Sequence, residues 1–154
     1  MSTDTQPVTG QDIGTASFAI RGLLDDVLAA EGTTFEPWVV LNLLATRGPT
    51  FEREALVQAL VTGIRAEPNA IRQLVGQLEL VGLVRPAADG GVELSPTGVA
   101  RFEQLRDAVA RLTVELYAPF DRTDLAITRR VLVELTERAT AWRAAAGAPK
   151  ATAS

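Results

Sequence analysis

Most of this chain is expected to be α-helical, with one short β-hairpin that lies between two helices. Apolar residues recur at helical spacing from Ile71 to Leu78, so one face of a helix there meets a core. Two short apolar runs follow, residues 82–84 and 92–94, and the tip between them, Asp89 to Gly91, tolerates the positive φ angles of a tight turn. Ser95 is a good N-cap for the next helix, and the proline after it suits a first turn. Helix, hairpin and helix in this order predict a winged helix-turn-helix with a two-stranded β wing.

The composition agrees with a single domain and excludes much chemistry. With 154 residues and 47% hydrophobic content, the chain can bury a sizeable core. It contains no cysteine and no histidine, so disulfides, thiol chemistry and the commonest metal ligand and general base are absent. We therefore expect no enzyme activity, no catalytic residues, no metal site and no cofactor.

The distribution of apolar residues favours a cytoplasmic protein. No apolar run approaches the roughly 20 residues that a membrane span needs. The N-terminal residues lack the basic region and the apolar core of a signal peptide. The expected location is therefore the cytoplasm, with no membrane partner.

The N-terminal third predicts a flexible tail and two helices. Residues 1–11 are polar and show no periodicity. A first helix over residues 12–31 has an apolar seam that we expect to pack on other helices, formed by Ile13, Ala16, Ile20, Leu23 and Val27. Thr33 or Thr34 can cap a second helix over residues 36–46, which is apolar on three sides and should be the central core helix.

The next segment predicts the helix-turn-helix. Pro49 breaks the chain, and Thr50 can cap a third helix over residues 51–64. One apolar stripe on that helix suits the supporting helix of a helix-turn-helix. Residues 65–67 make the turn, and Pro68 begins the recognition helix.

The C-terminal third predicts two long helices with more apolar surface than a monomer needs. The first runs over residues 96–118, and Asp121 caps the second, which reaches about residue 145. The second is apolar on several faces: Leu125, Leu132, Leu135, Ala139 and Trp142 share one, while Ile127, Val131 and Val133 lie on others. An apolar surface of that width calls for a partner.

These elements predict one domain between two tails. Residues 12–145 form the domain, in which residues 12–31 and 96–145 are the helices that join two identical subunits. Residues 36–95 are the winged-helix unit. Residues 146–154 are mostly small, and they form the second flexible tail.

Four segments resemble the MarR (multiple antibiotic resistance regulator) family of bacterial transcription regulators. GLV at residues 82–84, Asp89 and VELSPTG at residues 92–98 are similar to the pattern around that family's wing, and FEPWVVLNLLA at residues 35–45 is similar to its second helix. The resemblance implies a homodimer that binds double-stranded DNA through residues 36–95, at a palindromic or near-palindromic site. It also implies that the fourth helix enters the major groove and that the wing reaches toward the minor groove or the backbone.

The outward face of the recognition helix carries most of the candidate DNA-binding residues. Amide side chains can bond adenine bidentately, and arginine can bond guanine or phosphate. The predicted contacts are Arg65, Asn69, Arg72, Gln73, Gln77 and Arg85. Spacing alone also describes the solvent-facing side of an ordinary amphipathic helix, so that interpretation stays open.

Several residues depart from the family pattern. The net charge is −4, and residues 47–86 hold five arginines against four glutamates, so a dominant positive surface is missing. Asp89 is followed by two glycines, where the family has an arginine two residues later. Glu67-Pro68 places a carboxylate at the start of the recognition helix, and Leu80-Val81 is apolar where the family is commonly charged. Two functions therefore stay open: modest DNA binding, and a winged-helix protein-interaction module that has lost specific DNA binding.

A ligand crevice is a further implication of the resemblance. Many members of the family bind small aromatic anions between the dimerisation helices and the winged helix, and binding shifts the spacing of the two recognition helices. The candidate residues here are Phe18, Arg21, Trp38 and Phe51, with Arg21 as the partner of the anion. The three aromatic residues also fit a core, and a protein whose sole function is ligand binding is a third hypothesis.

Overall fold

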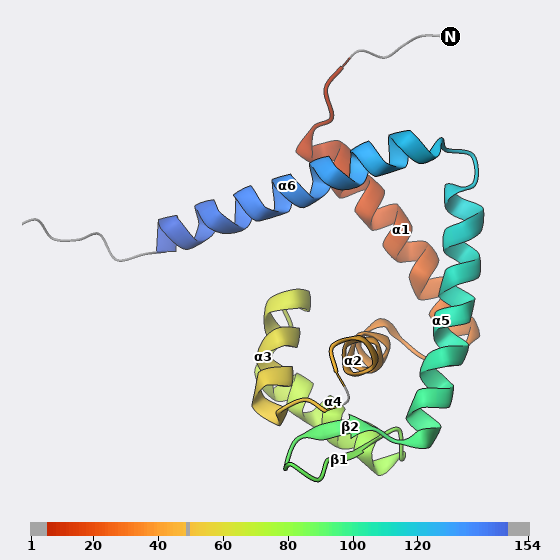
Figure 1. Cartoon of the computed structure of the whole chain (residues 1–154), viewed down its shortest axis with the longest axis vertical. Helices are drawn as coiled ribbons and strands as arrows, with labels where there is room; N and C mark the ends of the chain where they lie inside the picture. Colours follow the sequence, from red (N-terminus) through yellow and green to blue (C-terminus); the bar gives the residue numbers. More distant parts are fainter. Residues whose placement is uncertain (1–5, 49, 148–154) are drawn as a thin grey trace, which may run out of the picture. The chain divides into compact units, whose positions relative to one another are not determined.

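The computed structural model describes residues 6–48 and 50–147, which form six helices and one two-stranded antiparallel sheet (Figure 1). In chain order these elements are α1 (Gly10–Ala30), α2 (Phe35–Thr46), α3 (Arg53–Ile64), α4 (Pro68–Leu80), β1 (Val84–Pro86), β2 (Val92–Leu94), α5 (Pro96–Tyr117) and α6 (Arg122–Gly147). The mainly α fold with a two-stranded wing is confirmed. Pro49 and parts of both predicted tails, residues 1–5 and 148–154, lie outside the described residues.

The chain divides into two compact units within α5. The first unit ends at Val114, and the second begins at Glu115. The first contains α1 to α4, the sheet and most of α5, and the second contains the end of α5 and all of α6. One domain over residues 12–145 stays a prediction.

The core of the first unit is built around α2. Figure 1 shows α2 end-on, with α3, α4 and the sheet around it. Its buried side chains meet apolar residues of α3, α4, both strands and α5, and they are Trp38, Val40, Leu41 and Leu44. The prediction of a central core helix is confirmed.

Helix α4, the predicted recognition helix, has the two faces that its periodicity predicts. Pro68 occupies its first turn, where a missing N–H costs nothing. Ile71, Val75 and Leu78 are buried, and Leu74 is half-buried. The polar side chains between them are thereby turned to solvent.

The third helix begins later than predicted. Residue 53 starts α3, because Glu52 is the N-cap and its carboxylate accepts hydrogen bonds from the N–H groups of Glu54 and Ala55 at 3.0 and 2.7 Å. Phe51 is extended and exchanges two backbone hydrogen bonds with Val92, of 2.9 and 2.8 Å. Phe51 therefore extends the wing by one bridge, and its assignment to the helix was wrong.

The wing is tied at its tip and at its base. Val84 pairs with Leu94, and Pro86 pairs with Val92, so the first strand starts two residues after the predicted arm. At the tip, the carboxylate of Asp89 accepts from the N–H of Gly91 at 3.0 Å and from the hydroxyl of Thr50 at 2.9 Å. The segment before α3 thus holds the hairpin loop.

A serine and a glycine fix the start of α5. The hydroxyl of Ser95 accepts from the N–H of Gly98 at 2.9 Å, as predicted for an N-cap, and donates to the carbonyl of Gly82 at 2.5 Å. A side chain at Gly98 would overlap the backbone of Leu83. The glycine of the VELSPTG segment is therefore explained by close packing against Leu83.

Two long helices leave their apolar residues exposed. The first helix starts at Gly10, where Thr9 and Asp12 form a capping box, and only Leu28 of it is buried. Ile20 and Leu23 of the predicted seam are each 40% exposed, so the expected packing of this seam is not found in the single chain. α6 is capped by Asp121 as predicted, and none of its described residues is buried.

Candidate nucleic-acid interface

Four of the six predicted DNA contacts lie together on the outer face of α4. Asn69, Arg72, Gln73 and Gln77 are all exposed. They share this face because the buried stripe of α4 occupies the opposite side. The structure therefore brings amide and guanidinium side chains, two types that can bond base edges, onto one helix surface.

The arginine of this face is held on two sides. Arg72 donates from Nη2 to Oε1 of Glu54 at 2.6 Å and from Nε to Oε2 of the same carboxylate at 3.4 Å. It also donates from Nη1 to Oδ1 of Asn69 at 2.9 Å. The hydrogen bond from Arg72 lowers the pKa of Glu54, and the same contact raises the pKa of Arg72. The three residues form a single cluster, which we call the Arg72 cluster (Glu54, Asn69 and Arg72).

Two further arginines on this side of the fold are also paired with glutamates. Arg53 at the start of α3 binds Glu79 near the end of α4. Arg85 of β1 binds Glu93 of β2 at 2.8 Å. All three arginine–glutamate pairs are exposed or half-exposed, so solvent screens them and each contributes little to stability.

Sequence reasoning missed these acidic partners. The pair of Arg85 and Glu93 could have been predicted from the sequence, because the two residues face each other in a hairpin of this register. The pairs of Arg72 with Glu54 and of Arg53 with Glu79 span 18 and 26 residues. They depend on how α3 crosses α4, which no local pattern contains.

Arg65 has an unusual backbone conformation. It is the C-cap of α3 and has a φ of 54°, the one positive φ among the described residues other than glycine. A left-handed residue there ends α3 and starts the turn of the helix-turn-helix. Its exposed side chain forms no ion pair with any residue of the described ranges.

The four predicted ligand residues do not converge on one hollow. Trp38 is buried and stacks on Phe102, with ring centroids 5.7 Å apart. Phe51 belongs to the wing, and Phe18 is 84% exposed on α1. Arg21 lies over the ring of another aromatic residue, Phe35, and is paired with Asp25 at 2.9 Å.

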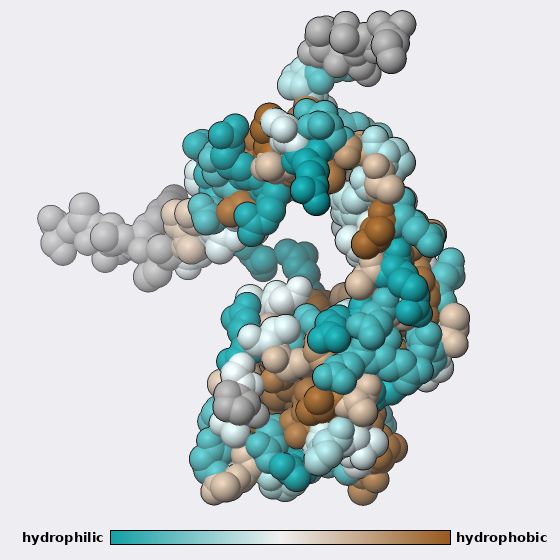
Figure 2. Space-filling view, turned by 45° about the vertical axis from the view of Figure 1, so that its right-hand side comes forward, coloured by the Kyte–Doolittle hydropathy of each residue, from teal (hydrophilic) through white to brown (hydrophobic). Residues whose placement is uncertain are grey.

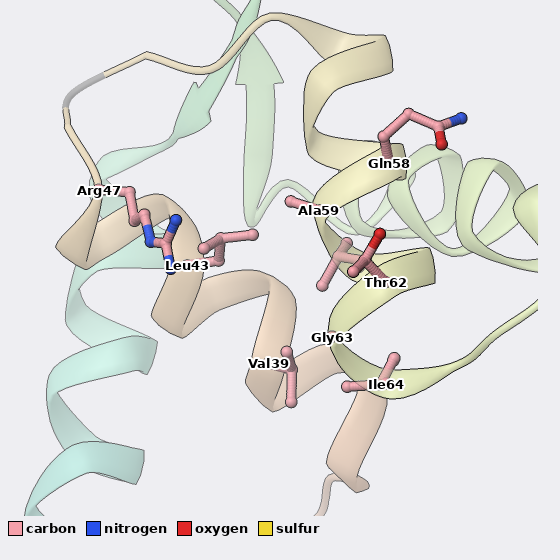
Figure 3. A pocket seen from close by; sticks show the side chains of 9 residues that line it. Val39, Leu43, Arg47, Gln58, Ala59, Thr62, Gly63 and Ile64 are labelled. Atoms are coloured by element: carbon pink, nitrogen blue, oxygen red, sulfur yellow. The ribbon is translucent and has the colours of Figure 1, made fainter. Parts of the chain in front are cut away.

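A hollow of about 570 Å³ lies elsewhere, between α2 and α3. Its walls are mostly apolar, and Figure 3 shows Val39 and Leu43 of α2 on one side and Ile64 of α3 on the other. Arg47, at the end of α2, lies at its rim and has no ion-pair partner within residues 6–48 and 50–147. The hollow therefore combines apolar surface with one unpaired guanidinium group.

The described part of the chain holds neither a candidate metal cluster nor a candidate membrane span. No cluster of three or more acidic side chains there could hold a metal ion. None of its helices has both the length and the apolar content of a membrane span.

Together, the helix-turn-helix of α3 and α4, the exposed polar face of α4 and the adjoining hairpin define a winged helix-turn-helix protein. No family model matches the sequence, and no curated protein matches it. Solved structures do match, and they include MarR of E. coli and a MarR family protein of Mycobacterium tuberculosis. The chain has the MarR-type winged-helix fold, so the resemblance stated from the sequence is confirmed at the level of the fold.

Three of these structures show the extent of the similarity. The Mycobacterium tuberculosis MarR family protein Rv2887, solved in complex with DNA, is 19% identical with a TM-score of 0.67 over 84% of this chain and 98% of its own. The transcriptional regulator PA3341 is 23% identical, with a TM-score of 0.72 over 85% of this chain and 97% of its own. Ligand-free NadR is 18% identical, with a TM-score of 0.72 over 89% of this chain and 99% of its own. Rv2887 has also been solved with p-aminosalicylic acid.

Proposed function

We propose that this protein is a cytoplasmic, homodimeric transcription regulator that binds double-stranded DNA through α4 and the wing. The exposed polar face of α4, opposite a buried apolar stripe and followed by a hairpin, is the observation that carries the proposal. The DNA complex of the similarly folded Rv2887 supports it. In this arrangement α4 enters the major groove, and its amides and arginine meet base edges.

The electrostatics of the surface predict modest affinity. The chain carries a net charge of −4, and three arginines of this side are already paired with glutamates. Binding to DNA exchanges the carboxylates that pair with Arg53 and Arg85 for phosphates, and the freed carboxylates stay near the phosphates. The affinity then depends on Arg47 and Arg65, which have no ion-pair partner among the described residues, and on base contacts.

A homodimer is part of the proposal. Ile127, Leu132 and Leu135 of α6 are between 40% and 46% exposed, as are Ile20 and Leu23 of α1. Apolar side chains reach the surface among polar ones in the space-filling view (Figure 2). Burial of these helices against a second copy removes the apolar surface from water and places two recognition helices on one DNA site.

Control by a small amphipathic acid is also part of the proposal. We assign it to the hollow between α2 and α3, because Val39 and Leu43 can contact an apolar body while Arg47 binds a carboxylate. The ligand complex of Rv2887 with p-aminosalicylic acid supports an acid as the ligand class. A thermal-shift screen with aromatic acids tests this assignment: Arg47→Ala abolishes the stabilisation by an active acid, whereas Arg111→Ala retains it.

A gel-shift titration against the DNA that flanks the protein's own gene tests DNA binding. We expect binding that weakens as salt rises, since phosphate contacts release counterions. Arg72→Ala weakens it at least about 10-fold, which corresponds to one lost base contact. Arg111→Ala, which removes an arginine on α5 away from α4, leaves it unchanged. Binding that ignores both salt and Arg72→Ala contradicts the proposal.

A protein-interaction module is the second candidate function. It is favoured by Leu80, which is 89% exposed at the end of α4, and by the neighbouring exposed Val81. An apolar pair suits a protein surface better than phosphates. If wild-type protein binds no DNA at 50 mM salt but captures a defined protein and loses it on Leu80→Lys, this second function holds.

A further inference from the structure

Resting on the DNA-binding function proposed above, we infer that Glu54 and Asn69 are positioning residues that hold Arg72 ready to read a guanine. Arg72 is the group that contacts the base in this inference. Glu54 comes from α3 and Asn69 from the first turn of α4, so the arginine is held from two helices. In this arrangement the Arg72 cluster determines the base preference of the outer face of α4.

The hydrogen bonds occupy one edge of the guanidinium group and leave another edge open. Nε and Nη2 form the side edge, and both donate to the carboxylate of Glu54. Nη1 donates one hydrogen to Asn69. Each Nη atom carries two hydrogens, so one on Nη1 and one on Nη2 remain. In the inferred arrangement Asn69 takes the Nη1 hydrogen on the Cδ side, and the two remaining hydrogens form the end edge of the planar fork.

Two parallel donors match one base edge in the major groove. Guanine presents two acceptors there, O6 and N7, whereas adenine presents one acceptor and one donor. Cytosine presents a donor and thymine a single acceptor with a methyl group. The free end edge of Arg72 is therefore complementary to guanine.

The same contacts change the role predicted for Asn69. A bidentate contact to adenine needs the amide oxygen as an acceptor and the amide nitrogen as a donor. Oδ1 of Asn69 already accepts from Arg72. Asn69 consequently supports the arginine, and Gln73 and Gln77 are the amides that remain for bases.

When the Arg72 side chain is held in place before DNA binds, the preference for one base changes more than the general attraction to phosphates does. A mobile arginine contacts guanine and phosphate alike, because it can reach either. In the Arg72 cluster, the side chain loses its freedom before DNA arrives, so less is lost on binding and the fork has one orientation. Removal of Glu54 should therefore lower base preference without lowering general affinity, because a negative charge is also removed from the surface.

The test uses the full-length protein and DNA selected from a random library. Competition gel shifts then compare the selected site with single-base variants, and 7-deazaguanine removes N7 alone. We expect one guanine in each half-site that wild type prefers about 10-fold or more over other bases. Arg72→Lys loses this preference. Glu54→Ala reduces it below about 3-fold while total affinity stays equal or rises.

Glu79→Ala is the matched control. It also removes one glutamate of an arginine pair joining α3 and α4, but it leaves the Arg72 cluster intact. It should keep the full guanine preference. A DNA-free measurement accompanies it: NMR relaxation of the Arg72 Nε–H shows an ordered group in wild type and in Glu79→Ala, and a mobile one in Glu54→Ala.

The outcomes separate the two proposals. If wild type selects no DNA at all, the proposed function fails and the inference fails with it. If wild type binds DNA but Glu54→Ala keeps its guanine preference, or no guanine depends on Arg72, the inference is overturned while the proposed function stands. Thermal midpoints of all variants confirm that each is folded.

Discussion

Gly98 lies so close to the backbone of Leu83 that only glycine fits at this position. A Cβ atom at this position would overlap the carbonyl group of Leu83. That carbonyl belongs to the backbone, so it cannot rotate away as a flexible side chain could. Gly98 is also buried in the first turn of α5, where the hydroxyl of Ser95 accepts from its N–H and donates to the carbonyl of Gly82.

We therefore predict that Gly98→Ala costs about 2–3 kcal/mol of unfolding free energy, because the start of α5 must shift away from Leu83. Gly76→Ala is the control, since a Cβ atom there meets nothing within 4 Å. It should gain about 0.5–1 kcal/mol from the lower helix propensity of glycine. Urea denaturation measures both, and equal effects in the two variants contradict the explanation.

Arg65 combines a strained backbone with a free positive charge. Its φ of 54° costs about 1 kcal/mol in any residue that carries a Cβ atom. Arg65→Gly should relieve this strain and raise the unfolding free energy, whereas Arg65→Ala should not. Both variants should weaken DNA binding and lower the salt slope by about one unit, because both lose a phosphate contact. Chemical denaturation and salt titration report the two effects separately.

At the scale of elements, carboxylates join segments that are distant in sequence. Glu54 links α3 to α4, and Asp89 links the wing tip to the segment before α3. Hydrogen bonds lower both pKa values: that of Glu54 mainly through Arg72, and that of Asp89 mainly through the N–H of Gly91 and then Thr50. These folded-state contacts need the ionised carboxylates.

The sign of the pH dependence follows from these lowered pKa values. The native state binds fewer protons than the unfolded state, so stability is present above the unfolded pKa and is lost as pH falls through the folded one. We expect a thermal midpoint that is constant from about pH 6 to 8, since the chain has no histidine, and that declines below about pH 4.5. Asp89→Asn should remove part of the decline. A step near pH 6.5 contradicts this account.

Element boundaries were predictable where the signal is local. Pro68, Ser95 and Asp121 start α4, α5 and α6 as expected, because caps and first-turn prolines act through neighbouring backbone groups. The start of α3 was missed because Phe51 pairs with Val92, 41 positions further on, and a cross-strand partner outweighs the helical pattern of its own segment.

At the scale of the whole molecule, the apolar faces of α1 and α6 call for a second copy. We predict a dimer with a mass near twice the 16.4 kDa of the chain, and a thermal midpoint that rises with protein concentration. Leu135→Asp on the apolar side of α6 should shift the protein to a monomer. Thr140→Asp, about 140° around the helix from Leu135, should keep the dimer, so the charge alone is controlled.

Sedimentation of the wild-type protein and both variants measures the oligomeric state and tests this prediction. A wild-type monomer, or a dimer that tolerates Leu135→Asp, overturns it. The same experiment bears on DNA binding, because a monomer presents one recognition helix and should bind a palindromic site more weakly than the dimer.

Local periodicity, caps and turn residues were enough to determine the helices, the wing and the outward side of α4, since those signals act within a few residues along the chain. The placement of charged partners was determined by packing alone. The contact between Glu54 and Arg72 exists because α3 crosses α4 there, and Phe51 joins the wing because the first unit brings residue 92 beside it. Such contacts join residues far apart in sequence, so they follow from the assembled core and not from any pattern within one segment.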